Sequence, residues 1–171
     1  AKSFNNLTHS GSGTLQLITN GITINGNFTN SAGTFDANGL TINIAGNWSN
    51  SATFTSGANT VNFTSASTQT LNSGGSAFNN ITHSGSGTLQ LVTNSLTVSS
   101  NFTNSSGTFD LNGQNWTMTG ATFSNAATVK LQGGETVTGL TQDIDSGTWV
   151  YAGDGDGAVD TFTIKDFGAT D

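Results

Sequence analysis

The sequence predicts an all-β protein: a single-stranded, right-handed parallel β-solenoid of about nine rungs, each of about 18 to 22 residues. Three observations favour this fold class. A long internal repeat covers much of the chain, short strand and turn motifs recur inside that repeat, and proline and helical spacing are both absent.

The long repeat opens with FNNLTHSGSGTLQL at residues 4–17, which returns as FNNITHSGSGTLQL at residues 78–91. The match continues to Gly39 and Gly113 at a constant offset of 74, and 27 of these 36 aligned pairs are identical. Self-similarity at a fixed spacing is typical of repeat proteins, in which each unit packs on its neighbours. We therefore expect two long repeats with this offset, each made of four rungs.

Shorter motifs recur within the long repeat. They are a Thr-apolar-polar triplet, a Gly-Thr-aromatic or Ala-Thr-aromatic triplet and an Asn-aromatic-hydroxyl-Asn segment, first seen as Thr23-Ile24-Asn25, Gly33-Thr34-Phe35 and Asn27-Phe28-Thr29-Asn30. Their alternation of apolar and polar residues predicts short strands, and the Asn-Gly pairs between them predict turns.

Three strands and three turns describe one coil of a solenoid. The coil is expected to take about 18 residues, as from Ile22 to Leu40, so that Phe35 and Phe109 belong to one inward column of rings. Parallel crossovers are overwhelmingly right-handed, which sets the expected hand. A coil of this length also fits a left-handed hexapeptide helix, but the six-residue repeat of aliphatic residues is missing.

The rival fold is a pair of immunoglobulin-like sandwiches, which also consist of short alternating strands. The long repeat is a small unit for a sandwich, and strands of a sandwich differ from one another, whereas these motifs recur. We expect one solenoid over residues 1–171, with regular rungs over 4–113 and more irregular, acidic rungs over 114–171.

Composition excludes several function classes. Charged residues make up 8% of the chain, there are three Lys and no Arg, and the net charge is −7, so neither nucleic acid nor an anionic membrane is an expected partner. The chain has no cysteine and no apolar run long enough for a membrane helix. No signal peptide is evident at Ala1, so we expect a mature chain or a fragment.

No constellation of residues predicts catalysis. His9 and His83 occupy equivalent repeat positions and are expected about 19 Å apart, as turn residues copied by duplication. Glycan-cleaving solenoids need clustered carboxylates, but only Lys2 and Asp36 are charged before Asp110. We therefore expect no enzyme and no catalytic residue.

The acidic end carries the one candidate metal site. Asp154, Asp156 and Asp160 alternate with glycines, and Asp143 and Asp145 precede them. Calcium binds oxygen ligands on a sharply turning backbone, so these residues are a candidate calcium site, although the EF-hand spacing and its terminal Glu are missing. The alternative is a solvated acidic turn, and no other cofactor is expected.

Two binding functions are alternatives to a structural one. The Thr-apolar-polar triplets, stacked rung on rung, would form a flat hydroxyl array resembling that of ice-binding solenoids, with Thr41 and Thr97 among its members. Exposed aromatic residues such as Trp48 or Trp116 would serve glycan binding. Threonine is also a favourable outward residue on any strand, so the array alone does not decide between these functions.

The Gly-Thr-Phe-Asp, Asn-Phe-Thr-Asn and Phe-Asn-Asn-Leu-Thr-His-Ser-Gly motifs resemble the Thr/Asn/Gly-rich solenoid repeats of large bacterial cell-surface proteins and filamentous, autotransporter-like adhesins. The resemblance implies an extracellular or cell-surface location and a rod-like stalk, and it carries over no active-site residue. We expect a structural segment whose partners are flanking repeats or other copies stacked end to end into a filament.

Overall fold

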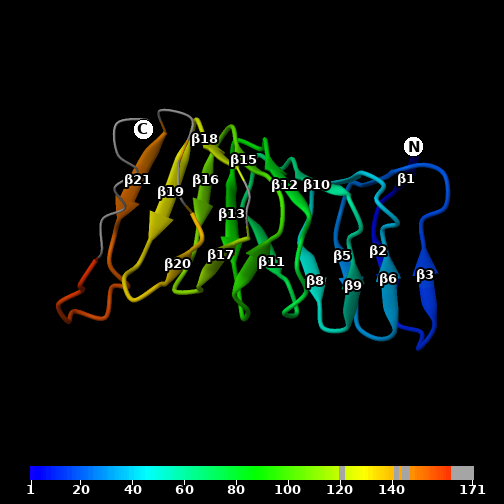
Figure 1. Ribbon diagram of the computed structural model, residues 1–171, viewed down its shortest axis with the longest axis horizontal. Coiled ribbons are helices and arrows are strands. Elements are labelled where there is room, and N and C mark those ends of the chain that lie inside the picture. The colour runs from blue at the N-terminus through cyan, green and yellow to red at the C-terminus, as the bar shows by residue number, and fades with distance from the viewer. Residues whose placement is uncertain (120–121, 141–142, 144–146, 163–171) are drawn as a thin grey trace.

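The computed structural model describes residues 1–119, 122–140, 143 and 147–162. All regular structure in these residues is β-strand, and none of them lies in a helix, so no helix there is long and apolar enough to cross a membrane. The strands pair in parallel across successive passes of the chain, which makes the protein a parallel β-solenoid of about seven turns. Figure 1 shows the coils following one another from the N-terminal end to the C-terminal end.

Four parallel sheets line the sides of the solenoid. The seven-stranded sheet consists of β1 (Lys2–Phe4), β4 (Ile22–Ile24), β7 (Ile42–Ile44), β10 (Thr60–Phe63), β12 (Asn80–His83), β15 (Phe102–Asn104) and β18 (Phe123–Asn125). The eight-stranded sheet consists of β2 (Leu7–His9), β5 (Phe28–Asn30), β8 (Trp48–Asn50), β11 (Gln69–Asn72), β13 (Thr88–Leu91), β16 (Thr108–Asp110), β19 (Thr128–Leu131) and β21 (Thr148–Tyr151). Two three-stranded sheets contain β3 (Thr14–Gln16), β6 (Thr34–Asp36) and β9 (Thr53–Thr55), and β14 (Leu96–Val98), β17 (Trp116–Met118) and β20 (Val137–Thr138).

The chain visits these sheets in a recurring order, the seven-stranded, the eight-stranded and then a three-stranded one. The third side is interrupted between β9 and β14, where Phe78 forms an isolated bridge to Val98. Each short strand turns alternate residues inward, as in β4, where Ile22 and Ile24 are buried and Thr23 is half-buried. The predicted all-β parallel solenoid is therefore confirmed in its class.

The coils are longer than predicted. Ile22 pairs with Ile42, not with Leu40, and side chains that bond between neighbouring coils are commonly 20 or 21 positions apart in the sequence. The difference arises at corners such as the one after β6, where Asn38 and Gly39 both adopt positive φ (49° and 72°). That corner continues through Leu40, whose N–H donates to the Ala37 carbonyl at 2.8 Å, so it takes more residues than a two-residue turn. Longer coils mean about seven turns in place of nine.

The long repeat does not return to the same side of the solenoid. Leu7 pairs with Phe28 and its counterpart Ile81 pairs with Phe102, so the local register is the same in both copies. However, β2 lies in the eight-stranded sheet and β12 in the seven-stranded one, because the repeat offset equals three full coils and roughly two thirds of a fourth. For the same reason Phe35, in β6, and Phe109, in β16, do not share a column.

Aromatic rings fill the core in two groups. The ring centroids of Phe28 and Phe35 lie 4.7 Å apart, and those of their counterparts Phe102 and Phe109 are also 4.7 Å apart. Both groups include tryptophan rings. The first group is Phe28, Phe35, Trp48, Phe54 and Phe78, and the second is Phe102, Phe109, Trp116, Phe123 and Trp149. Aromatic rings at these separations stabilise the core beyond the contribution of the apolar area that they bury.

Leu89 and Leu15 provide a matched test of how much the core depends on coils at both sides. They occupy equivalent places in identical Thr-Leu-Gln contexts, but Leu89 is fully buried and Leu15 only partly. We expect Leu89→Ala to lower the free energy of unfolding by about 2–5 kcal/mol and Leu15→Ala by clearly less. Urea unfolding of both variants measures this, and equal losses would contradict the burial difference.

Candidate functional site

The candidate calcium ligands Asp154, Asp156 and Asp160 form no metal-holding cluster within the described residues. Asp154 and Asp156 are exposed, and each accepts a hydrogen bond through Oδ1 from the N–H two residues later, at 2.9 and 2.7 Å. The Asp160 carboxylate lies beside Gly133 and beside Gly153, the residue before Asp154. No group of three or more His, Cys, Asp or Glu in the described part of the chain is placed to hold a metal ion. Calcium binding at Asp154, Asp156 and Asp160 therefore stays a prediction.

Asp143 is buried in a structural role. Its Oδ1 accepts the Asn125 N–H at 2.8 Å, and its Oδ2 lies 3.4 Å from the indole nitrogen of Trp149. Asp145, the other upstream acid, lies outside the described residues. Asp143 thus ties the last described coils to one another, and its carboxylate points inward to the backbone of Asn125.

The two histidines each begin an internal ladder of amides. His83 Nδ1 lies 2.8 Å from Asn104 Oδ1, and Asn104 Nδ2 donates to Asn125 Oδ1 at 2.8 Å. All three side chains are buried. The first copy repeats this pattern through its own His-Asn-Asn ladder, His9, Asn30 and Asn50, with separations of 2.8 and 2.7 Å. The histidines are therefore inward residues at strand ends, and the prediction that they are turn residues was wrong.

Burial changes the acid–base behaviour of His83. Desolvation lowers its pKa from the ordinary 6.5, and the hydrogen bond to Asn104 opposes this in part. The contact with the Asn104 amide oxygen requires a proton on Nδ1, and burial favours the neutral ring over the charged one. The side chains of this ladder, His83, Asn104 and Asn125, include no carboxylate and no nucleophile, and they join three successive coils.

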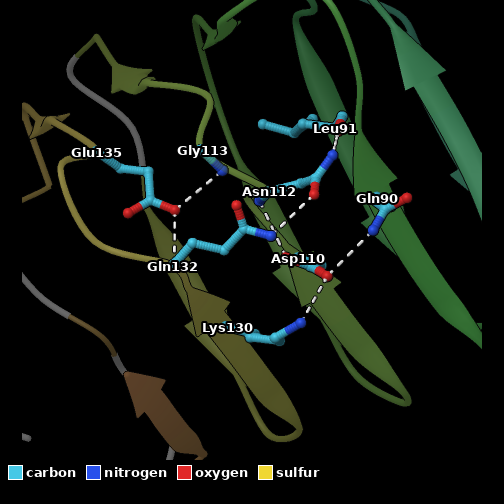
Figure 2. A network of polar contacts seen from close by, with 8 residues as sticks. All are labelled: Gln90, Leu91, Asp110, Asn112, Gly113, Lys130, Gln132 and Glu135. Carbon is cyan, nitrogen blue, oxygen red and sulfur yellow. Dashed lines mark hydrogen bonds and ion pairs between the residues drawn. The ribbon is translucent and has the colours of Figure 1, made fainter. Parts of the chain in front are cut away.

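Figure 2 shows a second polar ladder, on the outside of the eight-stranded sheet. Gln90, Asp110 and Lys130 lie in register on β13, β16 and β19. Asp110 Oδ2 accepts from Gln90 Nε2 at 3.3 Å and from Lys130 Nζ at 3.2 Å, while its Oδ1 accepts the Asn112 N–H at 2.9 Å. The Asp110 side chain is almost fully covered, and the ammonium group of Lys130 balances its negative charge.

At the adjoining turn between coils, also drawn in Figure 2, the carboxylate of Glu135 likewise accepts backbone N–H groups. Glu135 accepts three backbone N–H groups, from Gly113 at 3.1 Å, Gln132 at 2.7 Å and Gly133 at 2.7 Å. The side-chain amide of Gln132 donates to Asn112 Oδ1 at 3.0 Å. Asp110 and Glu135 each accept backbone N–H groups at this corner, so both carboxylates hold the turn between coils.

The predicted threonine array is not assembled as expected. Thr23 pairs with Asn43 and Thr60 pairs with Asn80, so these triplets do not form one hydroxyl column. Columns of threonine come instead mainly from the Gly-Thr-aromatic motif and its variants. The two such columns are Thr14, Thr34 and Thr53 on a three-stranded sheet, and Thr88, Thr108, Thr128 and Thr148 on the eight-stranded sheet. A third column, on the other three-stranded sheet, contains Thr97, Thr117 and Thr138.

The tryptophans expected to face solvent lie in the core. Trp48 is 1% exposed and Trp116 is fully covered. In the Asn-aromatic-hydroxyl-Asn segment the aromatic residue and the last Asn point inward together, so the polar flanks do not mark a surface position. The prediction that these two rings are exposed was wrong, and neither offers a surface on which a glycan could stack.

Comparison with known proteins adds no relative. No protein-family model, no curated protein and no solved structure matches the chain.

The lowered pKa of His83 predicts a pH dependence of stability. Between the folded pKa and the ordinary value near 6.5, the unfolded chain binds more protons, so the free energy of unfolding falls as pH decreases through this range. We expect a lower urea midpoint at pH 5 than at pH 7.5, and a smaller difference in His83→Asn.

His9→Asn is the matched control, because His9 begins the equivalent ladder with a partly exposed ring. This variant should keep most of the difference between pH 7.5 and pH 5. An unchanged difference in His83→Asn would show that protonation of other groups sets the pH dependence.

Proposed function

We propose that the chain is a structural, non-catalytic repeat segment of an extracellular or cell-surface protein, serving as a rigid stalk or adhesin rod. The main support for this proposal is the position of equivalent repeat residues around the solenoid. Equivalent strands such as β2 and β12 lie in different sheets, whereas a binding face enlarged by duplication would gather equivalent residues on one side. What both copies share is their pairing with neighbouring coils, which is a packing property.

The ladders suit a mechanical role. Backbone pairing and the side-chain ladders of His83 and Asp110 run from coil to coil, so they resist separation of coils along the axis. At about 4.8 Å per coil, seven turns give a rod roughly 34 Å long. We take the coil to be right-handed, following the general rule for parallel crossovers.

The extracellular location rests on composition and on the resemblance to surface-protein repeats. The lack of cysteine and the low content of charged residues, with many amide and hydroxyl side chains, are compatible with such a location. Flanking repeats, or other copies stacked end to end, are the proposed partners, and the exposed edge of the first coil supports this choice because unpaired strand edges invite pairing.

Single-molecule stretching between the two termini tests the mechanical role. We expect coils to detach in steps of about 20 residues, each lengthening the chain by roughly 70 Å, with resolved force peaks. Phe109→Ala should lower the peaks, because it removes a buried ring, whereas Thr41→Ala, at an exposed corner, should not. Extension of the native chain without measurable force peaks would contradict a mechanical role.

Ice binding is the second candidate, favoured by the regular column containing Thr108 and Thr128. Under the structural proposal we expect no thermal hysteresis from the native chain. Hysteresis that Thr108→Lys abolishes and Thr41→Lys retains would replace the structural proposal with ice binding, since Thr41 lies outside the threonine columns.

A further inference from the structure

The first coil has the sequence of an interior coil but lies at an end of the solenoid. Its apolar residues Phe4, Leu7, Leu15 and Leu17 are only partly buried. Their counterparts in the second copy, Phe78, Ile81, Leu89 and Leu91, are all at most 1% exposed. Next to them Ile18 is 77% exposed, whereas the equivalent Val92 is half-buried. An apolar surface thus remains on the first coil that the same residues do not show when another coil precedes them.

The backbone shows the same difference. In the second copy, the N–H groups of Asn80, Ser84, Gly87 and Val92 donate to carbonyls of the preceding coil at 3.0, 3.0, 3.1 and 3.0 Å. Their first-copy counterparts are Asn6, Ser10, Gly13 and Ile18, and none of these four N–H groups donates to an acceptor in the described chain. Apolar side chains and hydrogen-bond donors are therefore both presented at one edge.

The second copy also shows what fits this edge. Residues 59–72 cover it: β10 pairs in parallel with β12 so that Val61 lies over Ile81, and β11 pairs with β13 so that Leu71 lies over Leu91. The inward residues Val61, Phe63 and Leu71 are fully buried there. The carbonyl acceptors belong to this segment as well, at Asn59, Phe63, Ser65 and Leu71.

We propose that the coil of residues 4–18 is a docking surface for one further parallel β-coil with the pattern of residues 59–72. The partner offers inward aliphatic and aromatic side chains at the places of Val61, Phe63 and Leu71, and uncharged corners whose carbonyls meet the four donors. This proposal rests on the proposed structural function and specifies the partner of the rod at this end.

A second copy of the chain fits the surface less well. The last described strand, β21, is followed by a loop that carries the exposed Asp154 and Asp156. Stacking this end on the first coil would bring these carboxylates toward an apolar surface whose nearest cation in the sequence is Lys2, at a cost in desolvation. The uncharged segment of residues 73–77, which follows the covering coil in the second copy, carries no such cost.

The test is a chain in which residues 57–77 replace residues 1–3, so that the natural junction before Phe78 is recreated before Phe4. Amide hydrogen exchange by NMR reports on Asn6, Ser10, Gly13 and Ile18. We expect their exchange to slow by about 10-fold or more, because their N–H groups gain acceptors within a folded coil. In the same chain, Leu15→Ala should approach the destabilisation caused by Leu89→Ala.

The matched control is the same fusion with Val61→Asp, Phe63→Asp and Leu71→Asp in the added segment, which should leave the four amides unprotected. Equal exchange in the fused and unfused chains would overturn the proposal. So would protection in the unfused chain that rises with its concentration, because a second copy would then be the occupant. Neither result bears on the stretching experiment, which tests the structural function on the unfused chain.

Discussion

In-register parallel stacking is the constraint on which the rest of this structure depends. Each coil supplies the hydrogen-bond partners and the packing surface of the next coil along the chain. The effect of a residue on stability therefore depends more on the residues stacked above and below it in adjacent coils than on its neighbours in sequence. Ile22 over Ile42 and Ile24 over Ile44 extend an apolar column, and an unlike residue in one coil would disturb the coils on both sides.

The same constraint explains how the side-chain amide of Asn104 is tolerated in the core. A buried Asn costs free energy unless both its oxygen and its nitrogen find partners. Asn104 meets this condition because His83 lies on one side of it, Asn125 lies on the other, and its Nδ2 also reaches the Thr128 carbonyl at 2.9 Å. Replacing His83 with a residue that cannot donate would leave the buried Asn104 oxygen without this partner, so each coil depends on the side chain stacked in the next.

Composition and local motifs were enough to predict parallel coils, because alternation and turn residues act within a few positions. The register was not predictable in this way: Asn38 and Gly39 signalled a turn, but nothing in their identity shows that the corner extends to Thr41 and lengthens the coil. The side facing inward was also ambiguous for Asn-aromatic-hydroxyl-Asn segments. The flanking polar residues suggested an exposed Trp48, yet alternation puts Trp48 and Asn50 inside together, since Asn50 finds amide partners there.

The mismatch between repeat and coil has a consequence for any longer array with this spacing. Each step of the long repeat advances about two thirds of a turn beyond three whole coils, so a motif would return to the same side only after three steps. Three steps correspond to about eleven coils, or roughly 53 Å along the axis. Side-chain chemistry would then be spread evenly around the rod, while the contacts between coils are repeated in every step. This dispersal of surface motifs supports the proposed structural role over recognition by one face.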